Sequence, residues 1–296
     1  MKPLGRLAPT PSGELHLGNI TAFAAAWLSV RSAGGELVLR IEDVDRGRAR
    51  REVEDGQRRD LEWLGLSWDH EVAPQRDRDY LPWLERLSEQ TYRCTCTRKM
   101  IRDSGGTYTG TCRAAGHTEG VVRFRLPDAS ISYTDRRWGR RTVDLRQFGD
   151  PVLRRRDKVF AYNLAVVADD IADGVSEVVR GADLLDYAAV QTVLWQTLGA
   201  TPPTWLHAPL VLGPDGTKLA KRHASTSIAD LRTAGWSARD VWRVVLPWLG
   251  LDGDDLDHAA RHWRPDRGPL GPVQLLEAPT RAGIARWEPA PMLTSR

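Results

Sequence analysis

The residues best suited to binding phosphate lie between Arg6 and Asn19, where prolines and glycines interrupt the chain just before a helical pattern. From Ile20 onward, apolar residues recur at helical spacing, so we predict a short strand, a loop and then a helix that begins near Gly18. The start of a helix offers free backbone N–H groups and the positive end of the helix dipole, which together favour a phosphate group. Glycine at position 18 would let a nucleotide approach the backbone, because it has no Cβ.

A second group of residues that could bind phosphate lies in Gly213–Arg222, a glycine-rich segment that contains two lysines. Only five of the 42 lysines and arginines in the chain are lysines, yet Lys218 and Lys221 stand within four positions. A lysine ammonium is a compact and mobile charge, which suits a group that must follow a phosphate through a reaction.

These two segments resemble the paired signature motifs of the class I aminoacyl-tRNA synthetases. His16-Leu17-Gly18-Asn19 is similar to the HIGH motif, and Lys218-Leu219-Ala220-Lys221-Arg222 is similar to the KMSKS loop. Three further segments, Arg6–Thr10, Arg40–Asp43 and Val179–Asp183, resemble the glutamyl branch of that class. The resemblance extends over residues 5–235 and implies an α/β fold with a Rossmann-like, doubly wound parallel sheet.

The patterns between the motifs fit such a sheet. Glu36–Ile41 is an apolar run that predicts a buried parallel strand, and the carboxylates that follow it would face the ligand crevice. Amphipathic patterns predict helices over Arg50–Leu64 and Arg78–Gln90. The sheet is expected to resume near Phe160–Val167, and a helical pattern covers Ile228–Leu246, interrupted by Gly235 and ended by Pro247.

The resemblance and the patterns together predict four parts. Residues 1–90 form the first half of the catalytic domain, and residues 91–160 form a zinc-bearing insertion with a small antiparallel component. Residues 161–235 form the second half with the lysine loop. Residues 236–296 form a short helical tail without an anticodon-binding domain. The chain resembles, in this respect, the glutamyl-queuosine tRNA(Asp) synthetases, which look like truncated glutamyl-tRNA synthetases.

The three cysteines lie close together and suggest a structural zinc site. Cys94, Cys96 and Cys112 need a fourth ligand, and Tyr108 and His117 are the alternatives. Histidine is the commoner ligand in general. The spacing Cys-x-Cys-x11-Tyr-x3-Cys, however, resembles the queuosine-specific family, in which the tyrosine is a ligand, and this favours Tyr108. Three free thiols in a loop are the remaining alternative.

The resemblance also assigns roles to single residues. It implies that His16, Lys218 and Lys221 are catalytic, and that ATP is held by His16, Gly18, Asn19 and Lys221. It places the following residues around glutamate: Arg6, Leu7, Ala8, Pro9, Thr10, Glu42, Tyr162 and Arg180. Arg6 would pair with the side-chain carboxylate and Glu42 would accept from the ammonium. Alternatively, Arg6 and Glu42 form an ion pair that holds two strands together.

The family activates glutamate with ATP in the absence of tRNA and passes it to the queuosine base of tRNA(Asp). Mg²⁺ is expected with ATP. Two alternatives are a minimal glutamyl-tRNA synthetase and a zinc-stabilised RNA-binding module without activity. A third alternative is a small-molecule adenylyltransferase with a related phosphate loop.

The composition bears on the partners and the location of the protein. The net charge of +3 permits a nucleic-acid partner without requiring one, and the chain has no apolar run long enough to span a membrane. The N-terminus has no signal-peptide pattern, so we expect a cytoplasmic, monomeric protein that has no membrane partner. The basic runs 136–141 and 154–156 suit either RNA binding or solvated loops.

Overall fold

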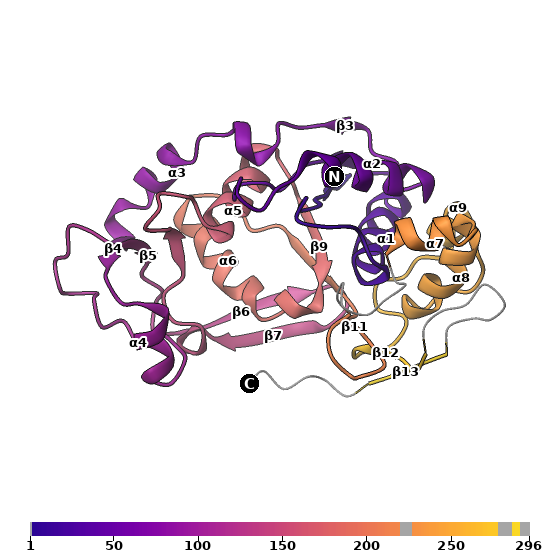
Figure 1. Ribbon diagram of the computed structural model, residues 1–296. Helices are drawn as coiled ribbons and strands as arrows, with labels where there is room; N and C mark the ends of the chain where they lie inside the picture. The colour runs from indigo at the N-terminus through magenta and orange to yellow at the C-terminus, as the bar shows by residue number, and fades with distance from the viewer. Residues whose placement is uncertain (1, 220–226, 278–285, 291–296) are drawn as a thin grey trace.

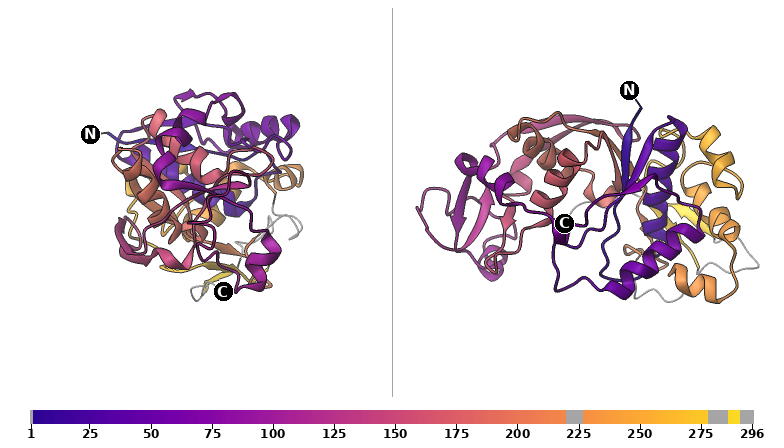
Figure 2. Two further views of the ribbon diagram at one scale, coloured as in Figure 1. Left: turned by 90° about the vertical axis from the view of Figure 1, so that its left-hand side faces the viewer. Right: turned by 90° about the horizontal axis from the view of Figure 1, so that it is seen from above.

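The computed structural model describes residues 2–219, 227–277 and 286–290, which form an elongated molecule (Figure 1). Parallel strands lie in the middle of the molecule. A small antiparallel sheet lies at one end and three short helices lie at the other, as the view from above also shows (Figure 2).

The first group of strands is parallel and is connected by helices. It contains β1 (Leu4–Leu7), β2 (Glu36–Leu39) and β3 (His70–Glu71), hydrogen-bonded in that order. Helix α1 (Leu17–Ser32) leads from β1 to β2, and α2 (Arg51–Trp63) leads from β2 towards β3. The predicted strand after Gly35, the helix near Gly18 and the helix before Gly65 are therefore confirmed.

The second group of strands lies beside the first. It contains β9 (Glu177–Gly181), β10 (Thr204–Ala208), β6 (Ser130–Asp135) and β7 (Gly139–Asp144), in the order β7-β6-β10-β9. Strands β9 and β10 are parallel, with Arg180 opposite His207. Helix α6 (Tyr187–Thr197) connects them. The two groups meet where the Ser176 N–H donates to the Leu4 carbonyl over 2.9 Å, at the start of β1 and just before β9.

The expected strand near Phe160–Val167 is wrong, because this segment opens helix α5 (Tyr162–Ala172). The sheet resumes only at β9. A short apolar run does not distinguish a buried strand from a buried helix, and here the run from Leu164 to Ala168 is buried all round its helix.

The predicted helix over Arg78–Gln90 is shorter in the structure. Helix α3 spans only Leu81–Arg86, and a 3₁₀ turn follows at Ser88–Gln90. Pro82 lies in the first turn of α3, where its missing N–H costs nothing, so the helix begins there and not at Arg78.

The antiparallel component expected within residues 91–160 is confirmed. Strands β4 (Thr91–Cys94), β5 (Val121–Phe124) and β8 (Val152–Arg154) form an antiparallel sheet, and α4 (Arg98–Asp103) follows β4. The hairpin of β6 and β7 lies within the same residues but pairs with β10, so it extends the central strands.

The last part of the described chain is partly helical. Its helices are α7 (Ile228–Thr233), α8 (Ala238–Trp248) and α9 (Leu256–His262), and Gly235 separates the first two at a φ of +81°. Strand β11 (Val211–Leu212) pairs with β12 (Val273–Leu275), which pairs with β13 (Trp287–Pro289). Within the described residues no helix is both long and apolar enough to cross a bilayer.

A buried network of charges joins the first group of strands to helix α5, which precedes β9. Arg40, directly after β2, is fully buried, and its guanidinium lies 2.6 Å from Asp170 and 3.0 Å from Asp173, in and just after α5. The Arg6 Nε, on β1, lies 3.0 Å from the same Asp170 oxygen. Burial alone would raise the pKa of Asp170, but Arg6 and Arg40 hold it below its ordinary value, so this carboxyl is ionised.

We predict that Arg40→Met destabilises the protein by about 3–5 kcal/mol, because it leaves several buried carboxylates without their cation. Urea unfolding at pH 7 measures the change. The matched control is Arg146→Met, because the ion pair of Arg146 with Asp144 is exposed to solvent and its loss should change the stability much less. Equal losses in the two variants would contradict a structural role for the network.

Candidate functional site

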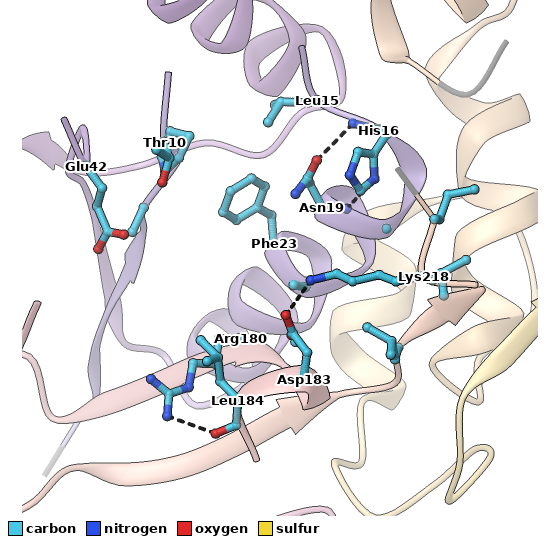
Figure 3. A pocket seen from close by; sticks show the side chains of 18 of the residues that line it. Thr10, Leu15, His16, Asn19, Phe23, Glu42, Arg180, Asp183, Leu184 and Lys218 are labelled. Atoms are coloured by element: carbon cyan, nitrogen blue, oxygen red, sulfur yellow. Dashed lines mark hydrogen bonds and ion pairs between the residues drawn. The ribbon is translucent and has the colours of Figure 1, made fainter. Parts of the chain in front are cut away.

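A cavity of about 430 Å³ opens at the carboxyl ends of β1, β9 and β10, beside the start of α1 (Figure 3). This is the edge at which parallel α/β sheets bind ligands. Most of the residues predicted from the sequence line this cavity. They are Arg6, Ala8, Pro9, Thr10, His16, Gly18, Asn19, Glu42, Tyr162, Arg180 and Lys218.

Two of the residues assigned to catalysis, ATP or glutamate are not among them. Leu7 is fully buried in the core and does not line the cavity, so its side chain serves packing. Lys221 lies outside the described residues, and its assigned role stays a prediction.

One end of the cavity combines two buried arginines with one buried carboxylate. Arg6 donates to Asp170 and, over 3.1 Å, to the Val179 carbonyl. Glu42 is paired with Arg40 at 3.3 Å, so the expected alternative of an Arg6–Glu42 ion pair is wrong. Burial raises the pKa of Glu42, although Arg40 and Arg6 oppose the rise.

Arg180 is the second buried arginine of this end, and neutral groups hold it. Its Nη1 donates to Gln191 Oε1 over 2.5 Å, its Nη2 to the Leu184 carbonyl over 3.2 Å and its Nε to His207 Nε2 over 3.0 Å. Within the described residues no carboxylate forms an ion pair with Arg180. Burial lowers its pKa, as expected for a cation without an anionic partner.

The other end of the cavity is the start of α1. His16 is the N-cap residue and forms a capping box with Asn19. Its Nδ1 accepts from the Asn19 N–H over 3.4 Å, and its own N–H donates to Asn19 Oδ1 over 3.1 Å. A Cβ on Gly18 would lie only 3.1 Å from the His16 ring, so glycine also makes room for this ring. His16 therefore caps α1, and its contact with phosphate stays a prediction.

Lys218 approaches the cavity from the segment after β11. Its ammonium pairs with Asp183, just after β9, and Figure 3 shows this pair between the start of α1 and Arg180. Both side chains are partly exposed, so an anion that enters the cavity can compete with Asp183 for the lysine.

The acidic partners of these cations were not predicted from the sequence. Asp169 and Asp170 stand in an otherwise apolar helix, and both are buried. Two adjacent carboxylates in an apolar run were the available signal, since buried acids need cations. Asp183 was visible in the sequence only as the end of a Gly-Ala-Asp turn.

The basic run 136–141 is largely used by the fold. Arg136 pairs with Glu177, Arg141 pairs with Asp186, and the buried Arg137 donates to the Pro269 carbonyl over 2.9 Å. Each of these three side chains therefore has a partner within the protein, and RNA binding by the run stays a prediction.

The three cysteines meet at one point, and their sulfur atoms all lie within 4.8 Å of one another. Cys96 Sγ and Cys112 Sγ are 3.6 Å apart. That distance is too long for a disulfide of about 2.05 Å. It is close to the edge of about 3.8 Å that a zinc tetrahedron with Zn–S bonds of about 2.3 Å requires. The residues therefore fit zinc.

The neighbourhood of the cysteines favours Tyr108 over His117 as the fourth ligand. Tyr108 is buried with the cysteines, its hydroxyl accepts from the Cys112 N–H over 2.9 Å, and the Arg123 guanidinium lies 3.9 Å from its ring centroid. The His117 side chain is exposed and bonds to the Thr95 hydroxyl. Burial raises the pKa of the Tyr108 hydroxyl to about 12, and a bound metal would lower it again, because metal ions lower the pKa of the groups that they bind.

Two glycines permit this arrangement. Gly120 has a φ of +110°, and a Cβ there would lie 2.3 Å from the Cys94 carbonyl oxygen. Gly149 has a φ of +65°, and a Cβ there would lie 2.3 Å from the Tyr108 carbonyl oxygen. Neither position accepts a side chain without moving the backbone that carries the ligands.

A family model and individual relatives of this chain indicate the same family. The family described as tRNA synthetases class I (E and Q), catalytic domain, matches residues 4–246. The Glutamyl-Q tRNA(Asp) synthetase of Nitratidesulfovibrio vulgaris is 42% identical over 289 residues, which cover 87% of this chain and 89% of that protein. The enzyme of the same name from Xanthomonas campestris is 43% identical, with 94% of this chain and 96% of that protein covered.

Solved structures are similar in fold. A glutamate tRNA ligase from Elizabethkingia meningosepticum, in complex with its amino acid, has a TM-score of 0.80 at 24% identity. The similarity covers 94% of this chain and 68% of that one. The glutamate-tRNA synthetase of Elizabethkingia anophelis has a TM-score of 0.79 at 23% identity, over 90% of this chain and 67% of that one. The class I fold predicted from the motifs is thus confirmed.

We predict that Tyr108→Phe weakens zinc binding by about tenfold or more, since the loss of even an outer partner of a metal ligand costs about that much. Competition with a chromogenic chelator measures the affinity. His117→Ala is the control and should bind zinc like the parent protein. Retained affinity in Tyr108→Phe together with lost affinity in His117→Ala would make the histidine the fourth ligand.

Proposed function

The chain belongs to the class I tRNA synthetases of the glutamate and glutamine branch, and within it to the glutamyl-Q tRNA(Asp) synthetases, and on this basis we propose how its cavity works. Membership makes the protein a ligase that acts on glutamate and tRNA. We propose that it activates L-glutamate with ATP to glutamyl-adenylate without tRNA, and then transfers glutamate to the queuosine base of tRNA(Asp).

The observation that carries the proposal is the composition of the cavity. One continuous space joins the N-terminus of α1 to two buried arginines and a buried glutamate. A helix N-terminus suits phosphate groups, and two arginines with one carboxylate suit an amino acid that has a side-chain carboxylate and an ammonium.

The amino-acid end fits glutamate better than a neutral amino acid. Arg6 is already neutralised by Asp170, whereas Arg180 forms no ion pair with a described carboxylate. A buried cation of this kind is costly unless a ligand supplies the negative charge. In this arrangement Arg6 and Arg180 bind the side-chain carboxylate of the substrate, and Glu42 binds its ammonium. The Tyr162 hydroxyl forms a further hydrogen bond with the substrate.

In the first step an oxygen of the glutamate α-carboxylate attacks the α-phosphorus of ATP. The bond from that phosphorus to the bridging oxygen of the β-phosphate breaks, and pyrophosphate leaves. The protein has no covalent part in this step. It positions the reactants and stabilises the charge that develops on the phosphates, through the start of α1, His16 and Lys218, and through Lys221 outside the described residues.

In the second step a hydroxyl of the queuosine cyclopentene ring attacks the carbonyl carbon of glutamyl-adenylate. An ester forms, the bond to the phosphate oxygen breaks, AMP leaves and the hydroxyl loses its proton. Mg²⁺ bound to the ATP phosphates would offset part of their charge, and zinc held by the cysteines and Tyr108 would fix the loop that carries them.

We predict that Glu42→Gln raises the KM for glutamate by about 10- to 100-fold, because it removes a charged hydrogen bond to the ammonium, with the KM for ATP nearly unchanged. Since burial raises the pKa of Glu42, lowering the pH protonates it and should raise the KM for glutamate in the parent protein. The Glu42→Gln variant should lose that additional rise. Initial rates of pyrophosphate exchange at several pH values test both points, and an equal rise of both KM values would contradict the assignment.

The test of the whole proposal separates its two steps. Glutamate-dependent exchange of pyrophosphate into ATP should occur without any tRNA, as measured with labelled pyrophosphate. Labelled glutamate should then appear on tRNA(Asp) that contains queuosine, and not on the same tRNA without that base. Exchange that begins only when tRNA is added would favour an ordinary glutamyl-tRNA synthetase. No exchange at all would favour an RNA-binding module.

A further inference from the structure

A buried histidine and aspartate lie directly behind Arg180, and neither lines the cavity. His207 on β10 and Asp135 at the end of β6 are both buried, with His207 Nδ1 2.7 Å from Asp135 Oδ2. The other ring nitrogen of His207 accepts from Arg180 Nε. The other carboxylate oxygen of Asp135 accepts from the backbone N–H groups of Arg137 and Trp138, each over 2.9 Å.

The chemistry of the partners fixes the form of this histidine. Arginine is only a donor, so His207 Nε2 must carry the lone pair and Nδ1 the proton, which is donated to Asp135. Burial lowers the pKa of His207 to about 4, although Asp135 opposes the shift, so the imidazole is neutral at pH 7. Trp138 Nε1 also donates to the His207 carbonyl over 2.9 Å, which ties the turn of the hairpin to the same residue.

We propose that His207 and Asp135 are positioning residues that orient the Arg180 guanidinium toward the substrate carboxylate without neutralising its charge. The inference rests on the proposed function, in which Arg180 binds glutamate. Arg180 differs in this from Arg6. Arg6 donates to a carboxylate, whereas the three hydrogen bonds that fix the Arg180 guanidinium all go to neutral acceptors.

This arrangement bears on selectivity. A guanidinium held at Nε, Nη1 and Nη2 keeps one plane, and a bidentate contact with a carboxylate depends on that plane. A cation that keeps its full charge in a buried place favours a carboxylate over an amide of the same shape. His207 and Asp135 therefore contribute to the choice of glutamate over glutamine.

The test compares glutamate with glutamine in pyrophosphate exchange without tRNA. His207→Leu should raise the KM for glutamate by about tenfold or more, since a buried hydrogen bond to a charged group is lost, and should change the KM for ATP by less than about twofold. The ratio of kcat/KM for glutamate to that for glutamine should fall by about tenfold. His207→Gln, whose amide oxygen can accept from Arg180, should recover part of both.

The matched control is Leu206→Ala, which changes the neighbouring buried residue of β10 and should lower stability without changing the ratio. If His207→Leu does not fold, Asp135→Asn carries the test, with an expected fall in the ratio of about fivefold. An unchanged ratio in the folded variants overturns the inference. Absence of glutamate-dependent exchange in the parent protein would instead overturn the proposed function, so the two failures are distinguishable.

Discussion

The ion pairs of Asp170 with Arg6 and Arg40 are the constraint on which the rest of the structure depends. Arg6 comes from β1, Arg40 directly follows β2, and Asp170 comes from α5, so the ion pairs connect the first group of strands to the helix that precedes β9. Charges buried this deeply are tolerated only when they are paired, and another alignment of the strands would leave them unpaired. The network thus sets the position of β1 and of the loop after it, which forms one wall of the cavity.

The same network explains why the two arginines of the cavity differ. Arg6 shares its charge with an internal carboxylate, whereas Arg180 is fixed by an imidazole, an amide and a carbonyl. The fold therefore supplies one arginine whose charge is neutralised by a carboxylate before any ligand enters, and one arginine that has hydrogen bonds but no ion pair with a described carboxylate. Within the family to which the chain belongs, this difference gives the cavity a physical preference for an anionic group at Arg180.

Local patterns predicted much of the fold, and the resemblance to a known family predicted most of the cavity wall. The helix after Gly18 and the strand after Gly35 follow from periodicity, and the motif resemblance brought His16 and Arg180 together although they are far apart in sequence. Periodicity failed at Phe160–Val167, where a helix buried on all sides has the same pattern as a buried strand. The roles of Asp170 and His207 could not be predicted. Asp170 pairs with an arginine more than a hundred positions away, and His207 bonds to an arginine on another strand.

The ion pair between Lys218 and Asp183 gives the cavity an internal anion that is attached to the same chain. Such a tethered carboxylate acts at a high effective concentration, so an incoming phosphate does not meet a bare ammonium but exchanges with Asp183. The free energy with which an anion binds this lysine is then the difference between the free energies of two ion pairs: the one that it forms with Lys218 and the one that it displaces. Added salt screens both members of the exchange, which makes the affinity of Lys218 for anions less sensitive to ionic strength than its charge alone would indicate.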